Sequence, residues 1–237
     1  MPQLTPPQVP HLDLAKALRR AASGDFPPVD GGFSRATPWR SGVEAAIAFT
    51  GHAVLAVGDD VTDGLMRDLG VHGYGGAHDP RTTAALAGDG EIGILDALLA
   101  GRGTGGPSPL VERPDLAQTP RARHAAHWRD EVRVYGLPDT TQPALATLGR
   151  GIAGLPEIGL EATDGSASAL LDGLLRLVPA GEVVLASVTP GNARSLRFFL
   201  RHGFVPVGSV QQWRPTGDRQ PPPRDQSMTP ATRAGSA

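Results

Sequence analysis

The sequence predicts an α+β protein built on a mixed, mostly antiparallel sheet with flanking helices. Two observations predict this class. From residue 131 the chain has the pattern of three successive strands joined by short turns. From residue 165 to residue 210 it continues as helix, strand, helix and strand. With 237 residues and 40% apolar content, the chain is long enough for one domain with a full core and some appendages.

The three successive strands are indicated by short apolar or alternating runs between turn residues. They are Val132-Arg133-Val134-Tyr135, residues 144–152 and residues 157–162, and the last alternates as expected for a half-buried strand. A Gly-Leu-Pro-Asp turn separates the first two, and a Gly-Leu-Pro turn separates the second from the third. Strands joined this closely pair antiparallel, so the sequence predicts an antiparallel meander here.

The C-terminal elements have clear start and stop signals. A helix is predicted from Gly165 to about Val178, and the β-branched run 183–188 is typical of an interior strand. The next helix begins at Asn192, a strong N-cap, and ends at Gly203, which tolerates the left-handed conformation. Residues 204–210 then form a final strand.

The first half of the chain has weaker patterns. Residues 43–57 contain strand-like runs around Thr50-Gly51-His52, and residues 91–100 fit either a helix or a strand. Helices are expected at 12–22, 62–69, 80–86 and 120–129, the second of them capped by Thr62 or Asp63.

We expect three regions: an N-terminal extension of residues 1–40, partly flexible, a folded domain of residues 41–213, and a disordered tail of residues 214–237. The tail is rich in Pro, Arg, Gln and Ser, and it has almost no large apolar side chains to offset the entropy of ordering.

Charge and composition exclude several classes of function. A net charge of -2 gives no field that attracts nucleic acid, so no nucleic-acid partner is expected. The absence of cysteine excludes disulfides and thiolate chemistry. We find no apolar run of membrane-spanning length and no signal-peptide pattern, which favours a cytoplasmic protein without a membrane partner. The pattern leaves the oligomeric state open.

Three familiar motifs are incomplete. Residues 101–106 satisfy G-x-G-x-x-G, but Pro107-Ser108-Pro109 follows where a dinucleotide-binding helix must begin, so a loop is expected. No lysine follows a glycine-rich segment, which excludes a Walker loop. The segment Gly165 to Ala169 lacks the glycine that a serine nucleophile elbow needs.

Histidines occur in two small groups. His124 and His127 are three residues apart, and His72 and His78 lie near Asp79. Neither group has a partner pair at a recognised metal-ligand spacing, so we expect surface or packing roles and no metal.

One segment resembles a known family. Asn192, Ser195, Phe199, Gly203 and Phe204 follow a buried strand in the order N-x-x-S-x-x-x-(aromatic)-x-x-x-G-F. This order resembles the last conserved block of the GNAT superfamily of acyl-CoA-dependent N-acyltransferases. The clear resemblance covers residues 131–213. It implies a GNAT-like fold with a splayed fourth and fifth strand pair, and it implies that residues 43–130 supply the first strand and the helices that wall the acceptor pocket.

The resemblance also implies a coenzyme site. In the family, a loop (Arg/Gln)-x-x-Gly-x-(Gly/Ala) binds the pyrophosphate of coenzyme A at a helix N-terminus, where free N–H groups favour anions. Gly165 and Ala167 match the Gly-x-(Gly/Ala) pair, and Ala162 stands at the Arg/Gln position in a shorter loop. The implied coenzyme contacts are Leu160, Ala162, Gly165, Ser166, Ala167, Ser168, Asn192, Ser195 and Phe199.

An acyltransferase of this kind needs a base for the amine. Glu157 and Glu161 lie four apart on the third meander strand and share a face, so either is a candidate base or a solvated edge charge. His52 and Tyr135 are further candidates. Phe199 stands where many members have a tyrosine that protonates the leaving thiolate. A phenyl ring has no proton to give, so Phe199 cannot play that part.

Two hypotheses follow. The first is an N-acetyltransferase that moves an acyl group from acetyl-CoA or a related acyl-CoA to a primary amine of a small molecule or peptide. The alternative is a protein that keeps the fold, binds acyl-CoA or a partner, and has lost the transfer chemistry.

Overall fold

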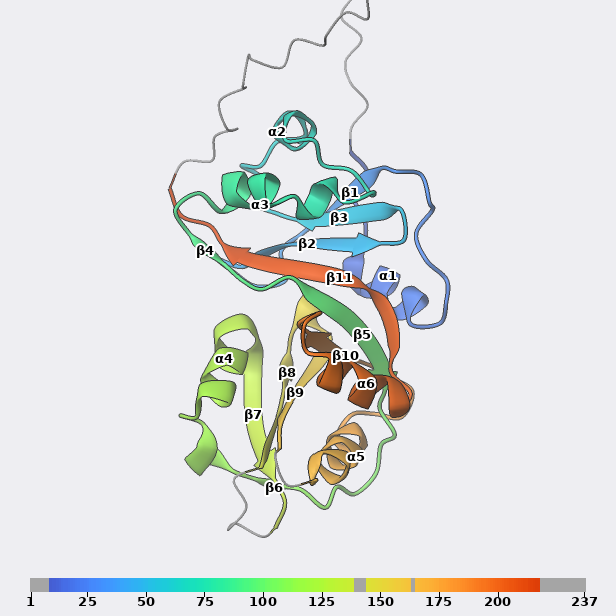
Figure 1. Cartoon of the computed structure of the whole chain (residues 1–237), viewed down its shortest axis with the longest axis vertical. Helices are drawn as coiled ribbons and strands as arrows, with labels where there is room; N and C mark the ends of the chain where they lie inside the picture. The colour runs from blue at the N-terminus through green and yellow to red at the C-terminus, as the bar shows by residue number, and fades with distance from the viewer. Residues whose placement is uncertain (1–8, 139–143, 163–164, 218–237) are drawn as a thin grey trace, which may run out of the picture.

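A computed structural model describes residues 9–138, 144–162 and 165–217, and its strands form one open, mixed sheet (Figure 1). The expected tail therefore lies largely outside the described residues. The strands are β1 (Phe33–Ala36), β2 (Glu44–Phe49), β3 (His52–Ala56), β4 (Glu91–Ile92), β5 (Asp96–Arg102), β6 (Val111–Glu112), β7 (Asp130–Gly136), β8 (Leu145–Arg150), β9 (Pro156–Glu161), β10 (Val183–Val188) and β11 (Val205–Arg214).

The helices flank this sheet. They are α1 (Leu14–Ala21), α2 (Asp63–Asp68), α3 (Pro80–Ala87), α4 (Pro120–Trp128), α5 (Ala167–Leu177) and α6 (Ala193–Arg201). The predicted fold class is confirmed. The expected helices and strands are present, β1 and β6 were not expected, and the ambiguous stretch 91–100 resolves into β4 and the first part of β5.

The strands follow the order β1-β3-β2-β11-β5-β10-β9-β8-β7-β6, and β4 pairs with β11 outside this path. The meander β7-β8-β9 is antiparallel, as predicted. Parallel pairing joins β1 to β3 and β9 to β10. The sheet is thus mostly antiparallel, with one parallel junction near its middle.

The position of β5 differs from the sequence-based expectation. The resemblance implied that residues 43–130 supply the first strand, and the runs in 43–57 and 91–100 indicated further strands. The region supplies β2, β3, β4, β5 and β6. Strand β5 lies between β10 and β11 and is antiparallel to both. Pairing between strands that are this distant in sequence leaves no local pattern. The residues of a strand indicate that it is buried, but they do not indicate which strand it pairs with. The first half of the chain therefore completes the centre of the sheet.

Strands β9 and β10 part after a single register pair, Leu185 with Glu157. On their outer sides both are fully paired: each residue of β10 has a partner on β5, and each residue of β9 has one on β8. The edges of β9 and β10 that face each other are therefore left without strand pairing beyond this point. This is the predicted splay.

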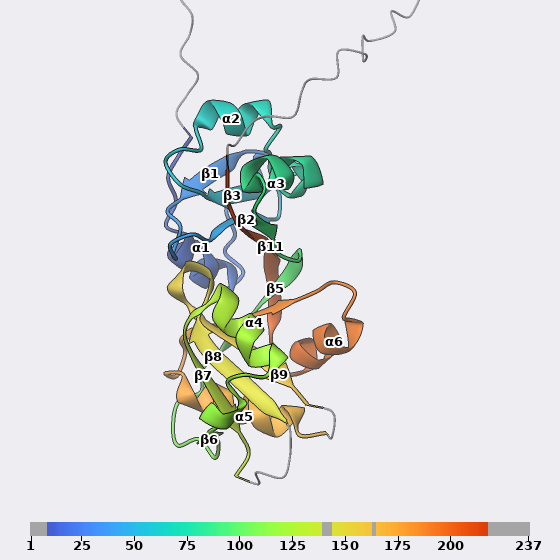
Figure 2. The same ribbon diagram turned by 90° about the vertical axis from the view of Figure 1, so that its left-hand side faces the viewer.

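Helices cover both faces beside the splay (Figure 2). Helix α4 packs on β7, β8 and β9 through Ala122, Val134 and Leu145. Helix α5 packs on β8 and β9, and its residues Leu170 and Leu174 share a core with Ile158 of β9. Residues of β9 alternate between these faces, so Glu157 and Glu161 lie on the side of α4.

Helix α6 has the predicted cap at each end. The Asn192 side chain accepts a hydrogen bond from the backbone N–H of Ser195 at 3.1 Å, and Gly203 has a φ of 81°. Phe199 is buried and lies edge-on to Phe204 at a centroid distance of 5.0 Å. The aromatic residue of the family-like segment is therefore a core residue that fixes α6 on the sheet.

Residues 9–40 contribute to the body of the protein. Helix α1 buries Leu14 and Leu18 in the core of the central strands. Strand β1 pairs with β3 and carries Arg35, which is buried and donates to the carbonyl oxygens of Val61 and Gly58.

The central position of β5 leads to a stability prediction. Leu98 of β5 is fully buried, so Leu98→Ala removes contacts and leaves a cavity, and it should lower the free energy of unfolding by about 2–5 kcal/mol. The matched control is Leu200→Ala, whose side chain is 46% exposed and which should change it by less than about 0.5 kcal/mol. Urea unfolding measures both. Equal effects of the two variants would contradict the placement of β5.

Candidate active site

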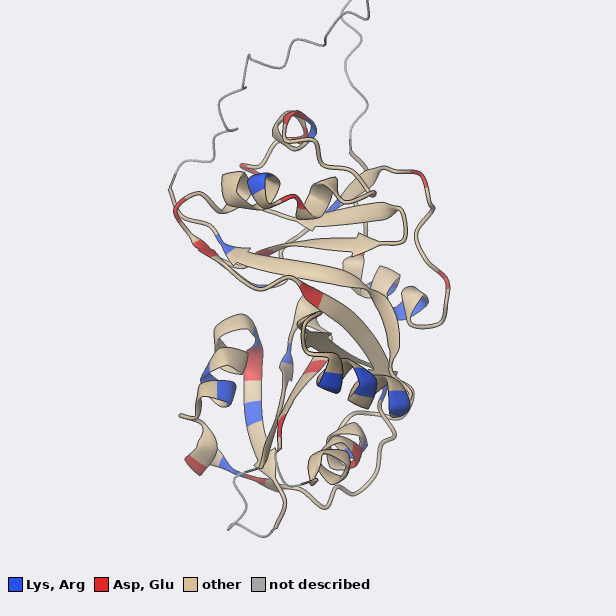
Figure 3. Cartoon of the chain, viewed as in Figure 1, with Lys and Arg blue, Asp and Glu red and all other residues tan. Residues whose placement is uncertain are grey.

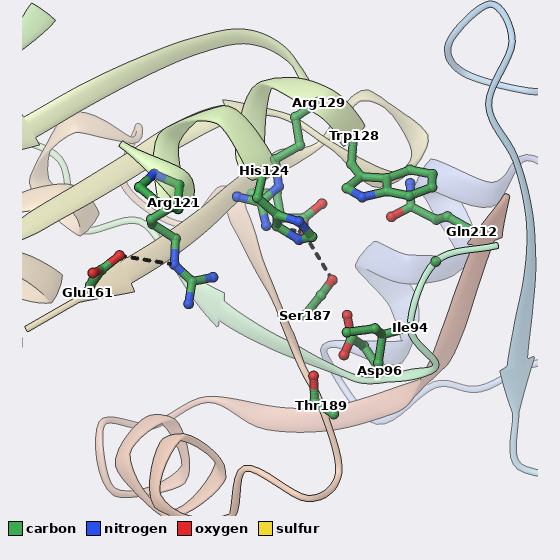
Figure 4. A pocket seen from close by; sticks show the side chains of 13 residues that line it. Ile94, Asp96, Arg121, His124, Trp128, Arg129, Glu161, Ser187, Thr189 and Gln212 are labelled. Atoms are coloured by element: carbon green, nitrogen blue, oxygen red, sulfur yellow. Dashed lines mark hydrogen bonds and ion pairs between the residues drawn. The ribbon is translucent and has the colours of Figure 1, made fainter. Parts of the chain in front are cut away.

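A cavity of about 490 Å³ lies at the splay, between α4 and the parted strands (Figure 4). Its lining comes from α4, the segment before β5, and strands β5, β9, β10 and β11. The lining residues are Gly93, Ile94, Asp96, Pro120, Arg121, His124, Trp128, Arg129, Glu157, Glu161, Ser187, Thr189 and Gln212. The cavity therefore gathers six titratable side chains from both halves of the chain.

Helix α4 presents one face to the cavity. Arg121, His124 and Trp128 recur at intervals of three and four residues, which places them on the same side of a helix. The helix begins with Thr119 as N-cap, whose hydroxyl accepts from the backbone N–H of Ala122, and with proline at the first position. Arg129 follows the last turn and turns back into the cavity.

Glu157 is only 2% exposed, and its carboxylate has the most hydrogen-bond partners of the acids in the site. Its Oε1 accepts from Arg129 Nη2 at 2.7 Å and from the Ser187 hydroxyl at 3.0 Å. Its Oε2 accepts from the backbone N–H of Ile152 at 3.2 Å. These contacts balance the buried charge. They also occupy both oxygens of the carboxylate.

Asp96 is an acid that the sequence did not single out. It begins β5 and lies on the same sheet face as Ser187 of the neighbouring strand β10. Burial raises the pKa of Asp96, and the nearby Glu157 carboxylate raises it further. The Thr189 hydroxyl, which donates to the carboxylate, and the guanidinium groups of Arg129 and Arg121 act in the opposite direction. The net result is a carboxylate that holds a proton more readily than an exposed aspartate.

Two buried polar atoms of the cavity have no hydrogen-bond partner among the described residues: Asp96 Oδ1 and Arg129 Nη1. One is an acceptor on an acid, and the other is a donor on a guanidinium group. Buried polar atoms are normally satisfied by protein, water or ligand. The cavity therefore offers one unfilled site for a donor and one for an acceptor.

The rim of the cavity is more exposed. Arg121 lies 3.9 Å from Glu161, and both side chains are about half exposed, so this ion pair contributes little to stability. Partial burial lowers the pKa of His124, and the positive charges of Arg121 and Arg129 lower it further. Neutral imidazole is then favoured at physiological pH, and it can accept a proton and pass it to solvent.

Several of the residues expected to hold the coenzyme lie at the start of α5. Gly165 has a φ of 89° and leads into α5, with open space where a side chain would stand. Ser166 is the N-cap residue of α5 and Ala167 its first residue. Ser168 Oγ lies 3.0 Å from Nε2 of His202, the residue after α6. The start of α5 and the end of α6 are therefore neighbours.

The remaining expected contacts are distributed as follows. Leu160 packs against the core beneath α5, and Ala162 follows the last residue of β9. Asn192 and Ser195 form the cap of α6, and Phe199 is buried under it. The structure thus brings the α5 and α6 ends together, whereas Phe199 lies inside the core.

His52 and Tyr135 do not line the cavity at the splay. Tyr135 borders a separate cavity of about 640 Å³ near the end of α5. His52 is buried between Asp30, whose Oδ1 lies 2.8 Å from Nδ1, and Ser34, whose Oγ lies 3.0 Å from Nε2. This set has the order of a hydrolase triad, but Ser34 is only 3% exposed. It acts as a buried polar link between the 30–32 turn and strands β1 and β3.

The other sequence motifs have structural roles. In the 101–106 segment, a side chain at Gly101 would approach the Phe204 ring to 2.6 Å, and one at Gly103 would approach the Pro179 carbonyl oxygen to 2.4 Å. These glycines permit close packing. His127 contacts Glu91 at 2.6 Å, and His78 contacts Ser209 at 2.9 Å. Within the described ranges, no group of three or more His, Cys, Asp or Glu side chains is arranged to hold a metal ion.

Comparison with known proteins gives partial structural similarities. No family model matches the sequence, and no curated protein matches it. The solved structures include a protein from Novosphingobium aromaticivorans described as an acetyltransferase of the GNAT family. It is 14% identical, with a TM-score of 0.38, and the alignment covers 55% of this chain and 69% of that one.

Two further solved structures have a similar sequence identity, TM-score and coverage. A conserved protein of unknown function from Staphylococcus epidermidis is 13% identical, with a TM-score of 0.35 and coverage of 57% and 66% of the two chains. A GCN5-related N-acetyltransferase from Kribbella flavida is 14% identical, with a TM-score of 0.32 and coverage of 54% and 61%. This chain spans less than two thirds of these two proteins. Similarity at this level does not establish an activity for this chain.

The described part of the chain contains no helix that is long and apolar enough to cross a membrane.

Burial of the Glu157 ion pair leads to a second prediction. Glu157→Gln removes the charge that balances Arg129, so the free energy of unfolding should fall by about 3–5 kcal/mol. Glu161→Gln is the same chemical change on the same strand, at an exposed pair, and should cost less than about 1 kcal/mol. Denaturant unfolding at pH 7 compares them. A Glu157 variant as stable as the Glu161 variant would show that this carboxylate does not hold the splay together.

Proposed function

We propose that this protein is an acyl-CoA-dependent N-acyltransferase of the GNAT type, which transfers an acyl group from acetyl-CoA or a related thioester to a primary amine. The observation that carries the proposal is the parting of β9 and β10 into a cavity that holds a buried, unpartnered carboxylate oxygen. An amine acceptor needs such a group beside the thioester. The family-like segment from Asn192 to Phe204 supports the same assignment.

The open strand edges suit the arm of the coenzyme. Beyond Glu157, the backbone N–H and C=O groups of β9 that face β10 have no strand partner there. The pantetheine arm is extended and carries amide groups, so it can satisfy such an edge in the manner of an added strand. This would bring the thioester to the cavity, because the splay opens into it.

The phosphate groups would lie at the neighbouring ends of α5 and α6. The first turn of α5 follows Gly165, and its backbone N–H groups have no helical partners. Ser168 stands in this turn beside His202. Helix α6 adds the exposed residues Arg194, Arg197 and Arg201, which form its basic surface (Figure 3). Arginine forms strong paired hydrogen bonds with phosphate. These side chains would supply phosphate contacts that Ala162, at the family's Arg/Gln position, cannot make.

We assign the role of base to Asp96. An acceptor amine is protonated at neutral pH and would give one proton to the unpartnered oxygen of Asp96. The neutral nitrogen then attacks the thioester carbon, the C–N bond forms and the C–S bond breaks. The second nitrogen proton passes to the departing thiolate, which gives the amide and free coenzyme A. Asp96 returns its proton to solvent, with neutral His124 at the cavity mouth as the relay.

The two glutamates would have different roles. Glu157 holds Arg129 and Ser187 in place, so we propose it as a positioning residue. Glu161 lies at the rim and would help to hold the acceptor or serve as a second base. Transfer of the second nitrogen proton to the thiolate removes the need for a tyrosine at Phe199, which is buried and has no acidic proton.

A second candidate is a module that binds acyl-CoA without transfer. The observations that favour it are Ala162 at the usual Arg/Gln position and the buried Phe199 at the usual acid position. The two candidates share the coenzyme site and differ only in chemistry.

Calorimetry with acetyl-CoA and release of free thiol over a panel of amines separate these candidates. For a transferase we expect saturable binding and thiol release that depends on the amine. Binding without thiol release on any amine would favour the binding module. Absence of binding at millimolar acetyl-CoA would refute both.

Asp96→Asn tests the base. We expect kcat to fall by roughly 10²- to 10⁴-fold while the Kd for acetyl-CoA stays unchanged. Because Asp96 must be ionised to accept a proton and its pKa is raised, kcat/KM of the wild type should fall on acidification at a pH above the ordinary aspartate value of 3.8. Unchanged kcat in the Asn variant would shift the role to Glu161, and Glu161→Gln would then carry the loss.

A further inference from the structure

The two unpartnered polar atoms of the cavity carry opposite charges, and a ligand that satisfies both must carry both charges as well. Asp96 Oδ1 accepts hydrogen bonds and carries negative charge, whereas Arg129 Nη1 donates and carries positive charge. Both line the same cavity. We propose that the acceptor is a small zwitterion, a free amino acid or similar compound whose ammonium group binds Asp96 and whose carboxylate binds Arg129. This proposal rests on the function proposed above and specifies its substrate class.

The other charges of the cavity are already balanced. Glu157 is paired with Arg129 Nη2 at 2.7 Å, and Glu161 lies 3.9 Å from Arg121. Asp96 has a hydroxyl donor in Thr189 but no ion pair among the described residues. An ammonium group would balance it. A simple amine would do this while leaving Arg129 Nη1 buried without an acceptor, and an unsatisfied charged donor is costly.

Arg129 has one guanidinium nitrogen engaged by Glu157 and one without an acceptor. Gly159 lies on β9 beneath this guanidinium group, and a side chain there would approach Nη1 to 3.5 Å. The same Cβ would meet the Thr147 hydroxyl at 2.9 Å, so the guanidinium group lies close over the bare backbone of β9. Glu157 fixes the other nitrogen, so Nη1 is held in place before a ligand arrives. A preorganised charged donor of this kind favours a carboxylate over a neutral amide.

The remaining walls fit the carbon skeleton of such a molecule. Trp128 is 8% exposed and forms a flat apolar wall, and Ile94 stands at the mouth with 62% exposure. The volume of about 490 Å³ exceeds that of a single amino acid, which leaves space for the acyl group. A peptide N-terminus is a poorer match, because its neighbouring carboxylate is replaced by an amide.

The proposal is tested by binding and by turnover. The probes are the free amino acids, including β-alanine, in the presence of coenzyme A. Each amino acid that binds is compared with its decarboxylated amine, its amino acid amide and its deaminated acid. We expect calorimetry to show binding of the amino acid at least about tenfold tighter than binding of the amine or the amide, as for one charge-assisted hydrogen bond. With acetyl-CoA, kcat/KM should follow the same order.

Arg129→Lys is the diagnostic variant, because lysine keeps a positive charge for Glu157 and removes the second nitrogen. It should raise KM for the amino acid by about tenfold or more and leave KM for the decarboxylated amine unchanged. Arg123→Lys is the matched control on the exposed side of α4 and should change neither value.

The outcomes separate the two proposals. Equal use of amine and amino acid, or equal loss with both in Arg129→Lys, would overturn the zwitterion and leave the transferase standing. Binding of amino acids without thiol release would overturn the transferase and retain the zwitterion site. Absence of amino acid binding at millimolar concentration in a protein that acetylates other amines would also overturn the zwitterion proposal.

Discussion

The architecture of the site depends on one buried carboxylate at the point where β9 and β10 part. Glu157 forms the single register pair between these strands with Leu185, and its side chain joins Ser187 of β10, Arg129 after α4 and the backbone N–H of Ile152. A buried charge is stable only when it is compensated this fully. The same residue therefore ties β9 to β10 at their one register pair and orients Arg129.

Strand β5 is the strand that pairs with both β10 and β11, which the C-terminal half of the chain does not contain. It fills the space between β10 and β11, so β10 is fully paired on its outer side and keeps only its inner edge for the splay. Its first residue is Asp96, which lines the cavity on the side of the sheet. Helix α4 closes the cavity from above with Trp128 and His124. The proposed chemistry thus needs residues from both halves of the chain.

The sequence predicted elements well where the signals are local. The Asn192 cap, the Gly203 stop and the β-branched run 183–188 each depend on the conformational preferences of a few neighbouring residues, and the structure has them as expected. Strand β1 was missed because Phe33–Ala36 contains an arginine whose burial is made possible by the carbonyl oxygens of Val61 and Gly58. The place of β5 was missed because pairing between distant strands has no local pattern.

The candidate site was only partly predictable for the same reason. Alternation along residues 157–162 correctly placed Glu157 and Glu161 on one face. The difference between them, one buried and fully hydrogen-bonded and the other at the rim, is set by Arg129 and Ser187, which are distant in sequence. Asp96 was not singled out, because nothing in the run 91–100 marks this aspartate as buried. Its burial and its unpartnered oxygen arise only when β5 meets β10.

The most direct test of the splay as the coenzyme site is hydrogen exchange of the backbone amides of β9 with and without acetyl-CoA. If the coenzyme arm pairs with the open edge of β9, amides between Ile158 and Glu161 that face β10 should exchange more slowly when acetyl-CoA is bound. Amides that face β8 should change little, because they are already paired. Binding measured by calorimetry with unchanged exchange along β9 would contradict this account.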